Sequence, residues 1–318
     1  MVSINCITYN HKEYIENAIE SFLMQKTDFD YEILIHDDAS TDGTSEIVLE
    51  YQKNYPKIIK PLIQKENQYS KNINCRIIDF NNDRAKGKYI AICEGDDYWI
   101  DPYKLQKQVD YMEANPKCTL HTHSVKIIRA QDDKPIGLIS PYKNSTICKT
   151  EDVISGGGGF FGTCASLFPK KAFENNPQWY LDSPVCDYPI QMLLAMRGYV
   201  YYSDEVMAAY RLNSQGSWTQ KLFSEKRNYN EFHKKMIAML ENFNEYSKFK
   251  YDGVVKKTIK KYMFDMLMVN DMYNELRSEE YKELYLSLSL LIRVKMFIKQ
   301  RFGFFAKIII GLKRKLQK

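Results

Sequence analysis

The sequence has no long apolar run and no zinc-type arrangement of cysteines. Its hydrophobic segments stay well short of the roughly 20 residues that a membrane-spanning helix needs, and no basic stretch precedes an apolar one at the N-terminus. We therefore expect neither a transmembrane helix nor a signal peptide. The seven cysteines are scattered, without a Cys-x-x-Cys pair, which is typical of a protein in a reducing cytoplasm.

Glycine is missing where a dinucleotide-binding protein needs it. Val2 to Thr8 is a β-branched apolar segment that predicts a strand, and the residues after it, Tyr9 to His11, contain no Gly-x-Gly-x-x-Gly loop. This absence excludes an NAD-dependent oxidoreductase. It also counts against a nucleotidyltransferase, which would require a glycine-rich phosphate loop at the same place.

The last 28 residues contain no acidic residue and nine basic ones. Since the whole chain has a net charge of +5, the residues before this tail carry a net charge of −4. Between Leu291 and Leu316 the apolar residues fall on one side of a helix and most basic residues on the other. Two roles stay open for this tail: contact with an anionic membrane, or packing within the protein or a homo-oligomer. The negative remainder makes nucleic acid a poor partner.

The rest of the composition is that of a folded globular protein, with 44% hydrophobic and 27% charged residues. Expected strands alternate with helices, which predicts an α/β fold whose largely parallel sheet has helices on both faces. These strands are Val2 to Thr8, Tyr31 to His36, Ile58 to Ile63, Tyr89 to Cys93 and, later, Cys118 to Ile128. Beyond Trp218 glycine nearly vanishes and helical patterns continue. We therefore predict a catalytic domain at 1–218 and an α-helical C-terminal region at 219–318.

Three local features carry further expectations. Asp101 and Pro102 predict the start of a helix, with Asp101 as its N-cap. Asp152 to Gly162 contains four consecutive glycines, which favour a loop that moves or lets a ligand approach the backbone. His121 and His123 share one face of a strand, but no third ligand is near in sequence, so we expect them to pack beneath a cleft rather than bind metal.

Acidic residues stand at the ends of two predicted strands. Asp37 and Asp38 follow the second strand, and Glu94-Gly95-Asp96-Asp97 follows the fourth. Ligands of open parallel sheets bind at this edge, and carboxylates crowded there repel one another unless a cation compensates. Oxygen ligands suit Mg²⁺ or Mn²⁺, and such an ion also holds a diphosphate. The alternative interpretation is a solvated acidic turn.

Taken together, these motifs resemble family 2 of the inverting glycosyltransferases, in the right order over residues 1–218. The resemblance implies a GT-A fold, which is Rossmann-like, a nucleotide-sugar donor and a divalent metal, Mn²⁺ or Mg²⁺. The motifs are Tyr9-Asn10, the Asp-Asp-x-Ser-Thr-Asp-Gly string at 37–43, Lys86 to Ile90 leading into Glu94 to Trp99, and Tyr210-Arg211 with Gly216-Ser217-Trp218.

The resemblance also implies roles in donor binding. Asp38 corresponds to the residue that hydrogen-bonds the base, usually uracil, and the backbone around Thr8 and Tyr9 lines the base pocket. Asp96 corresponds to the residue near the ribose and Asp97 to the metal ligand. Glu94 stands where an Asp is frequent, so it is assigned no role.

Two later residues complete the predicted site. Asp187 precedes an apolar helix, Ile190 to Met196, where similar proteins carry the base that removes the acceptor's proton; the alternative is a helix N-cap. Arg211 lies in Tyr-Arg-x-Asn, with Asn213 in place of the family's histidine. Its guanidinium either clamps the diphosphate or forms a structural ion pair.

The sequence thus predicts an inverting glycosyltransferase that moves a sugar from a nucleotide sugar, UDP being favoured, to an acceptor hydroxyl. The acceptor classes implied are a glycan, a lipid-linked and a protein-linked saccharide. We expect the chain in the cytoplasm or at the inner face of the membrane. The rival hypothesis is a catalytically silent subunit that binds nucleotide sugar and serves assembly.

Overall fold

The computed structural model describes residues 1–71, 77–214 and 226–301. Some predicted features lie outside these ranges. They are Cys75, the Gly216-Ser217-Trp218 motif, the predicted domain boundary after residue 218, and residues 302–318 of the tail.

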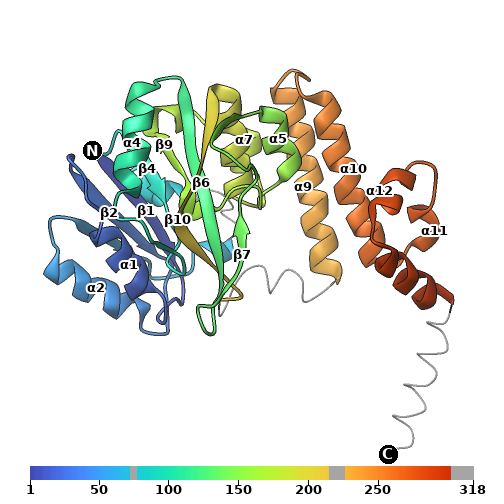
Figure 1. Cartoon of the computed structure of the whole chain (residues 1–318). Coiled ribbons are helices and arrows are strands. Elements are labelled where there is room, and N and C mark those ends of the chain that lie inside the picture. The colour runs from blue at the N-terminus through green and yellow to red at the C-terminus, as the bar shows by residue number, and fades with distance from the viewer. Residues whose placement is uncertain (72–76, 215–225, 302–318) are drawn as a thin grey trace, which may run out of the picture.

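The chain folds around one mixed sheet, and the part built by the N-terminal strands is parallel (Figure 1). Here the strands lie in the order β3-β2-β1-β4, which confirms the predicted alternation of strands and helices. Because these strands run parallel, the loops that follow β1, β2 and β4 meet at one edge. The elements are β1 (Val2–Thr8), α1 (Ile15–Leu23), β2 (Tyr31–Asp37), α2 (Thr44–Asn54), β3 (Ile59–Ile63), η1 (Tyr69–Lys71), α3 (Asp79–Asn82) and β4 (Tyr89–Ile92).

The other part of the sheet mixes directions. β9 lies between β4 and β6 and runs antiparallel to both, whereas β10 is parallel to β6 and antiparallel to β5 and β8. β7 extends β6 as an antiparallel partner. These elements are β5 (Tyr98–Trp99), α4 (Lys104–Ala114), β6 (Cys118–Arg129), β7 (Pro135–Ile139), β8 (Thr146–Cys148), α5 (Thr150–Gly156), η3 (Thr163–Ala165), β9 (Leu167–Pro169), η4 (Lys170–Phe173), α6 (Gln178–Leu181), α7 (Asp187–Arg197) and β10 (Tyr199–Leu212).

Helices cover both faces of the sheet, and each face has its own apolar core. Successive side chains of a strand point to opposite faces. In β2, Ile33 and Ile35 accordingly join the core beneath α1 and α4, while Leu34 joins the core formed with α5, α7 and α9. The predicted α/β architecture with two covered faces is confirmed.

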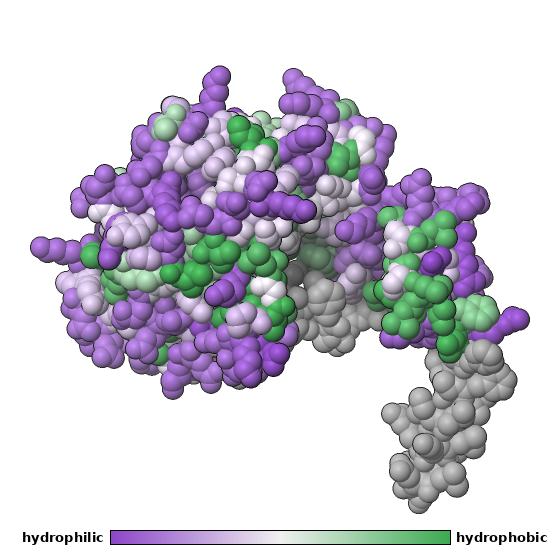
Figure 2. All heavy atoms as spheres, viewed as in Figure 1, coloured by the Kyte–Doolittle hydropathy of each residue, from purple (hydrophilic) through white to green (hydrophobic). Residues whose placement is uncertain are grey.

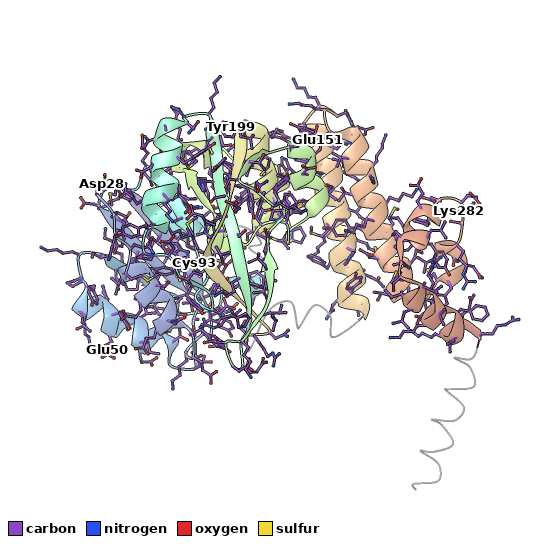
Figure 3. The ribbon with its side chains drawn as sticks, viewed as in Figure 1. Asp28, Glu50, Cys93, Glu151, Tyr199 and Lys282 are labelled. Carbon is purple, nitrogen blue, oxygen red and sulfur yellow. The ribbon has the colours of Figure 1, made fainter. Side chains whose placement is uncertain are left out.

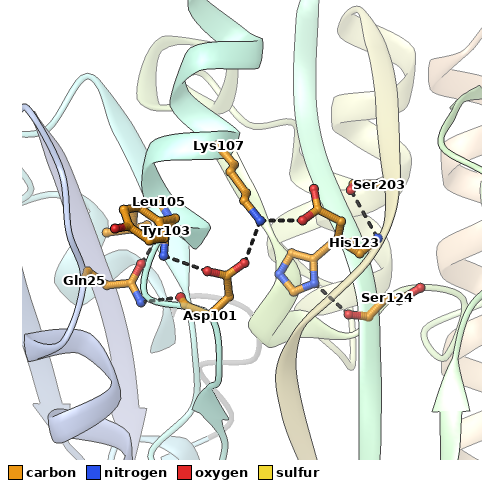
Figure 4. A network of polar contacts seen from close by, with 9 residues as sticks. Gln25, Asp101, Tyr103, Leu105, Lys107, His123, Ser124 and Ser203 are labelled. Carbon is orange, nitrogen blue, oxygen red and sulfur yellow. Dashed lines mark hydrogen bonds and ion pairs between the residues drawn. The ribbon is translucent and has the colours of Figure 1, made fainter.

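The helix predicted to open at residues 101 and 102 begins at Lys104. Asp101 still organises its start, because its Oδ1 accepts the N–H of Tyr103 at 2.8 Å and its Oδ2 lies 2.8 Å from Nζ of Lys107 (Figure 4). Gln25, just beyond α1, donates to the Asp101 carbonyl at 2.9 Å. This contact between distant segments fixes the boundary, and it could not be read from the local sequence.

The segment Asp152 to Gly162, expected to be a loop, is partly helical. Helix α5 includes its first five residues, so the prediction was wrong there. Val153 and Ile154 are fully buried in the core, and their burial outweighs the poor helix propensity of the glycine that follows. The loop proper begins at Gly157, whose φ of 69° favours glycine.

The C-terminal helices begin with a hairpin of α9 (Lys226–Tyr246) and α10 (Asp252–Val269) that packs on α5 and α6. Leu240, Phe243 and Val255 from this hairpin belong to the same core as α7. The helices α11 (Tyr273–Leu276) and α12 (Lys282–Ser287) form a smaller cluster with the helical residues 290–301. In the described ranges no helix has the length and apolar character needed to cross a bilayer.

Burial shifts the pKa of several cysteines and histidines. The cysteines of the described ranges are free, and burial raises the pKa of Cys93 and Cys164. His121 and His123 are buried in β6, where burial lowers the pKa of both. Among the described residues no three His, Cys, Asp or Glu side chains converge as a metal site by themselves.

Candidate active site

Four carboxylates gather where β4 ends and α7 begins. Glu94, Asp96 and Asp97 follow β4, and Asp187 is the first residue of α7. The charge of Asp96 and, more weakly, that of Asp187 raise the pKa of Glu94, so both lie within electrostatic reach of Glu94. The sequence separates Asp187 from the other three by about 90 residues, and the fold unites them.

Gly95 lets the acidic turn pack tightly on β1. Its N–H donates to the Ile7 carbonyl at 2.9 Å. A Cβ atom at this position would lie 2.6 Å from Oγ1 of Thr8, closer than side-chain atoms approach. A larger residue at position 95 would therefore push the neighbouring acids away from β1.

Asp97 points into the protein. Its side chain is 2% exposed, and its Oδ1 accepts the backbone N–H of Arg211 at 2.9 Å. Burial and then the charges of Asp96 and Glu94 raise its pKa well above the usual value. Asp97 thus ties β10 to the acidic turn, and its assignment as the metal ligand stays a prediction.

Asp96 is the more open of the two aspartates, with 19% of its side chain exposed. Its Oδ2 accepts the Ser214 hydroxyl at 2.7 Å and lies 3.8 Å from Nε2 of His11. Ser214 follows β10, and His11 follows β1. Asp96 therefore stands where three loops of the sheet edge meet.

Glu94 is buried among these charges. Burial, followed by the charge of Asp96, raises its pKa to about 8. Its Oε2 is buried and has no hydrogen-bond partner within the described part of the chain. Buried polar atoms are nearly always paired, so an unpaired carboxylate oxygen points to a bound ion or donor group. From the sequence alone, no role is assigned to Glu94.

Asp187 combines a local contact with an open oxygen. Its Oδ1 accepts the N–H of Tyr188 at 2.8 Å, but the N-cap position of α7 is held by Cys186, so the structure does not place Asp187 as the N-cap. The backbone of Gly158 lies on the other side, where a Cβ would be 3.2 Å from Oδ2. No other described residue donates to Oδ2. Burial raises the pKa of the carboxyl, as suits a general base.

Arg211 is occupied by structural contacts. Its side chain is 5% exposed and donates to the Asp96 carbonyl at 2.8 Å and to Asn17 at 2.9 Å. Nε also contacts Asp133 at 3.2 Å, and the guanidinium lies 4.7 Å from the centre of the Tyr98 ring. These contacts match the structural alternative, because they hold the acidic turn rather than face the open edge.

The predicted base-binding residues lie together at the ends of β1 and β2. Asp38 is 2% exposed, and its two carboxylate oxygens accept the backbone N–H groups of Gln68 at 2.6 Å and Tyr69 at 3.0 Å. Its own N–H donates to the Thr8 carbonyl at 3.0 Å. Tyr9, with 38% exposure, lies at the surface of the same edge. The structure therefore brings Thr8, Tyr9 and Asp38 together.

The donor set fits a divalent ion that is shared with a diphosphate. Asp96 supplies a carboxylate oxygen at the open edge, and the buried, unpaired Oε2 of Glu94 is a suitable ligand atom. Mg²⁺-type sites commonly use one or two carboxylates together with substrate phosphates and water. That chemistry agrees with the lack of a complete protein cage among the described residues.

Sequence reasoning missed the contacts that His11 and Ser214 make with Asp96. Asn213, in the position of the family's histidine, adopts φ 65°, a conformation that Asn tolerates, and Ser214 follows it toward Asp96. Asn is one of the few residues suited to such a turn, but nothing in the sequence showed which side chain the turn would orient.

Comparison with known proteins agrees with this geometry. Residues 3–175 match the family described as Glycosyl transferase family 2. The chain belongs to this family. An uncharacterized protein of Mycobacterium tuberculosis is 32% identical over 232 residues, which cover 72% of this chain and 63% of that protein. A second family relative is WfaP of Escherichia coli, a UDP-Glc:α-D-GlcNAc-diphosphoundecaprenol β-1,3-glucosyltransferase, which is 36% identical over 36% of this chain and 42% of its own length.

Solved structures confirm the GT-A fold of this family 2 chain. S. aureus TarS in complex with UDP-GlcNAc matches with a TM-score of 0.60 at 14% identity, over 92% of this chain and 77% of TarS. The mannosyltransferase PcManGT of Pyrobaculum calidifontis, in complex with GDP-Man and Mn²⁺, matches with a TM-score of 0.54 at 13% identity, over 95% of this chain and 87% of its own. At this identity the likeness concerns the fold.

The contacts of Arg211 predict a structural effect of its replacement. Arg211→Lys keeps the charge but not the branched set of donors, so we expect the free energy of unfolding to fall by about 2–4 kcal/mol. Urea denaturation measures this change. Arg129→Lys, on an exposed pair with Asp132, is the matched control and should stay within about 0.5 kcal/mol. Unchanged stability with weakened UDP binding would instead assign Arg211 to the diphosphate.

Proposed function

We propose that the chain transfers a sugar from a UDP-sugar to an acceptor hydroxyl by a single inverting displacement. One observation carries this proposal: Asp187, with its open Oδ2, lies beside the acidic turn of Glu94 and Asp96. Direct displacement needs a base and a diphosphate site on opposite sides of the transferred sugar, since the hydroxyl attacks opposite to the leaving group.

Donor recognition is proposed to use the base pocket at the ends of β1 and β2. The Asp38 oxygens already accept two backbone N–H groups, and a base such as uracil presents the same kind of donor. Thr8 and Tyr9 line this pocket. Structural neighbours support a nucleotide sugar as donor, because TarS was solved with UDP-GlcNAc and PcManGT with GDP-Man.

Glu94 and Asp96 are proposed to hold Mn²⁺ or Mg²⁺, with Asp97 supporting them from below. The resemblance placed the metal on Asp97, but this carboxylate is buried and hydrogen-bonded to the backbone of Arg211. When bound, the ion neutralises charge on the departing diphosphate. Asp96 is oriented by Ser214 and lies near His11, so its position is set before the donor arrives.

Asp187 is proposed to accept the proton of the attacking hydroxyl. Burial raises its pKa, which makes the carboxylate a stronger base. The hydrogen bond from Tyr188 fixes one oxygen and leaves Oδ2 for the substrate. The start of α7 thus orients the group that the chemistry requires.

Asp187→Asn tests the function as a whole. Wild-type protein should turn over at least one member of a panel of UDP-sugars with Mn²⁺ and none with EDTA. The Asn variant keeps the shape and polarity of the side chain but cannot accept a proton, so transfer should fall by about 10²–10⁴-fold. UDP affinity, measured by calorimetry, should remain close to wild type.

Asp182→Asn is the control for this experiment, because Asp182 is an exposed residue shortly before α7. Transfer by Asp187→Asn within about threefold of wild type would exclude Asp187 as the base. Absence of any chelator-sensitive turnover in wild-type protein, with UDP still bound, would favour the silent binding subunit.

The metal assignment predicts opposite results for two neighbouring aspartates. Asp96→Asn should weaken Mn²⁺-dependent UDP binding more than about tenfold, because it removes a ligand charge. Asp97→Asn retains an oxygen for the Arg211 amide and should change the same binding less than about threefold. Calorimetric UDP titrations with Mn²⁺ and with EDTA measure both effects, and the reverse ranking would return the metal to Asp97.

The acceptor is proposed to be lipid-linked, and the C-terminal helix is proposed to contact an anionic membrane. WfaP, a relative, is named for a diphosphoundecaprenol-linked acceptor. In helix 290–301 Met296 packs inward, whereas Leu290, Leu291 and Phe297 are 50% or more exposed. Figure 2 shows hydrophobic side chains gathered over this part of the surface. Arg293 and Lys295 lie on the same helix, and no acid occurs from residue 291 onward, which favours anionic lipid over a second copy of the chain.

Replacing the exposed apolar residues tests this contact. The variant Leu290→Ser/Leu291→Ser/Phe297→Ser should lose flotation with vesicles containing phosphatidylglycerol, while UDP-sugar hydrolysis stays unchanged because no proposed site residue is altered. The control is Leu49→Ser, because Leu49 is an exposed apolar residue of α2, far from the C-terminal helix in sequence. Loss of dimer mass rather than of flotation would assign the helix to assembly.

A further inference from the structure

The helical hairpin of α9 and α10 brings Tyr262 next to the proposed base. A Cβ at Gly157 would lie 3.7 Å from the Tyr262 hydroxyl oxygen, and a Cβ at the next residue, Gly158, would lie 3.2 Å from Oδ2 of Asp187. Tyr262 and Asp187 therefore flank one two-residue turn. The charge of Asp187 also raises the pKa of Tyr262, which agrees with this closeness.

The turn is reached from α5, which lies between the sheet and the hairpin; Glu151 marks this helix in Figure 3. Gly157 adopts φ 69°, and a side chain here would extend toward Tyr262. The glycines thus keep the space between Asp187 and the hairpin free of side-chain atoms. The need for this open space explains why glycines occupy the turn, which flexibility alone would not explain.

Tyr262 belongs to a cluster of polar aromatic and acidic side chains on the hairpin. Its ring meets His233 of α9 edge to face at 5.3 Å, and His233 stacks on Tyr229 at 3.9 Å. Asp265, one turn along α10, lies close enough to influence the pKa values of Tyr262 and His233. Nδ1 of His233 contacts the Tyr229 carbonyl at 2.9 Å, which leaves Nε2 for another partner.

The cluster has more hydrogen-bonding capacity than the described residues use. Neither the Tyr262 hydroxyl nor the Asp265 carboxylate has a hydrogen bond or ion pair with another residue in the described ranges, although both are partly buried and burial raises the pKa of Asp265. A purely structural cluster would pair such groups, because unpaired polar atoms cost free energy. An aromatic ring beside an open hydroxyl and an open carboxylate suits a pyranose, which offers C–H groups to the ring and hydroxyls to the oxygens.

We propose that Tyr262, His233 and Asp265 form a subsite for the acceptor sugar, opposite the donor and beside Asp187. This inference rests on the proposed glycosyl transfer, and it makes the C-terminal hairpin part of the active site. The ligand is a pyranose whose attacking hydroxyl reaches Oδ2 of Asp187 while its ring contacts Tyr262. Acceptor choice would then be determined by α9 and α10, outside the segment that matches the family.

Tyr262→Phe and Tyr262→Ala test the subsite with phenoxyundecyl diphosphates, each carrying one pyranose, as the acceptor probes. Loss of one hydroxyl should raise the acceptor KM about three- to tenfold in the Phe variant, and loss of the ring should raise it more than about tenfold in the Ala variant. The KM for the donor should not change, because the proposed base pocket at the ends of β1 and β2 is not altered. Saturation-transfer NMR with UDP and Mn²⁺ measures binding of the same probes independently of turnover.

Tyr246→Phe is the matched control, since this tyrosine lies at the other end of α9 and is 42% exposed. Acceptor KM and probe binding within twofold of wild type in both Tyr262 variants would overturn the proposal. So would a wild-type protein that hydrolyses donor but neither binds nor glycosylates any probe. If no donor is turned over while probe binding still depends on Tyr262, the subsite stands and the proposed transfer fails.

Discussion

Like-charged carboxylates held close together in a protein repel one another, and the site at the end of β4 depends on how that repulsion is balanced. Burial and mutual charge raise the pKa of Glu94 and Asp97. The Arg211 guanidinium donates to the backbone carbonyl of Asp96, and the backbone N–H of Arg211 donates to the Asp97 carboxylate. Protein groups thus stabilise Asp96 and Asp97, while Oε2 of Glu94 has no hydrogen-bond partner among the described residues.

Support for this turn extends beneath the sheet edge through α4. The indole N–H of Trp99 donates to the Cys164 carbonyl at 2.9 Å, and Gln108 donates to the Ala165 carbonyl at 2.9 Å. The same Gln108 accepts from the buried Lys104 at 2.7 Å, so side chains of β5 and α4 together hold η3 in place. Precise placement of reacting groups requires this kind of second layer, because small displacements are costly in transfer reactions.

The C-terminal hairpin of α9 and α10 packs directly on the elements around the candidate site. Its apolar residues share a core with α7, the helix that carries Asp187 at its start. A change in the packing of α9 would therefore displace α7 and with it the proposed base, Asp187. The hairpin also brings Tyr262 to the Gly157–Gly158 turn that borders Asp187.

The sequence by itself determined the order of strands and helices, because apolar periodicity and turn residues are local, and it determined which strand ends carry acids. It also located Asp187, Asp38, Asp96 and Asp97 through motifs. Only the tertiary structure decided how these residues divide the work: Asp97 turned inward and Asp96 outward, Arg211 was taken up by structural contacts, and Glu94 was left with an open oxygen. Such differences depend on contacts between segments as far apart as Asn17 and Arg211, and Tyr262 and Gly157, which no local pattern records.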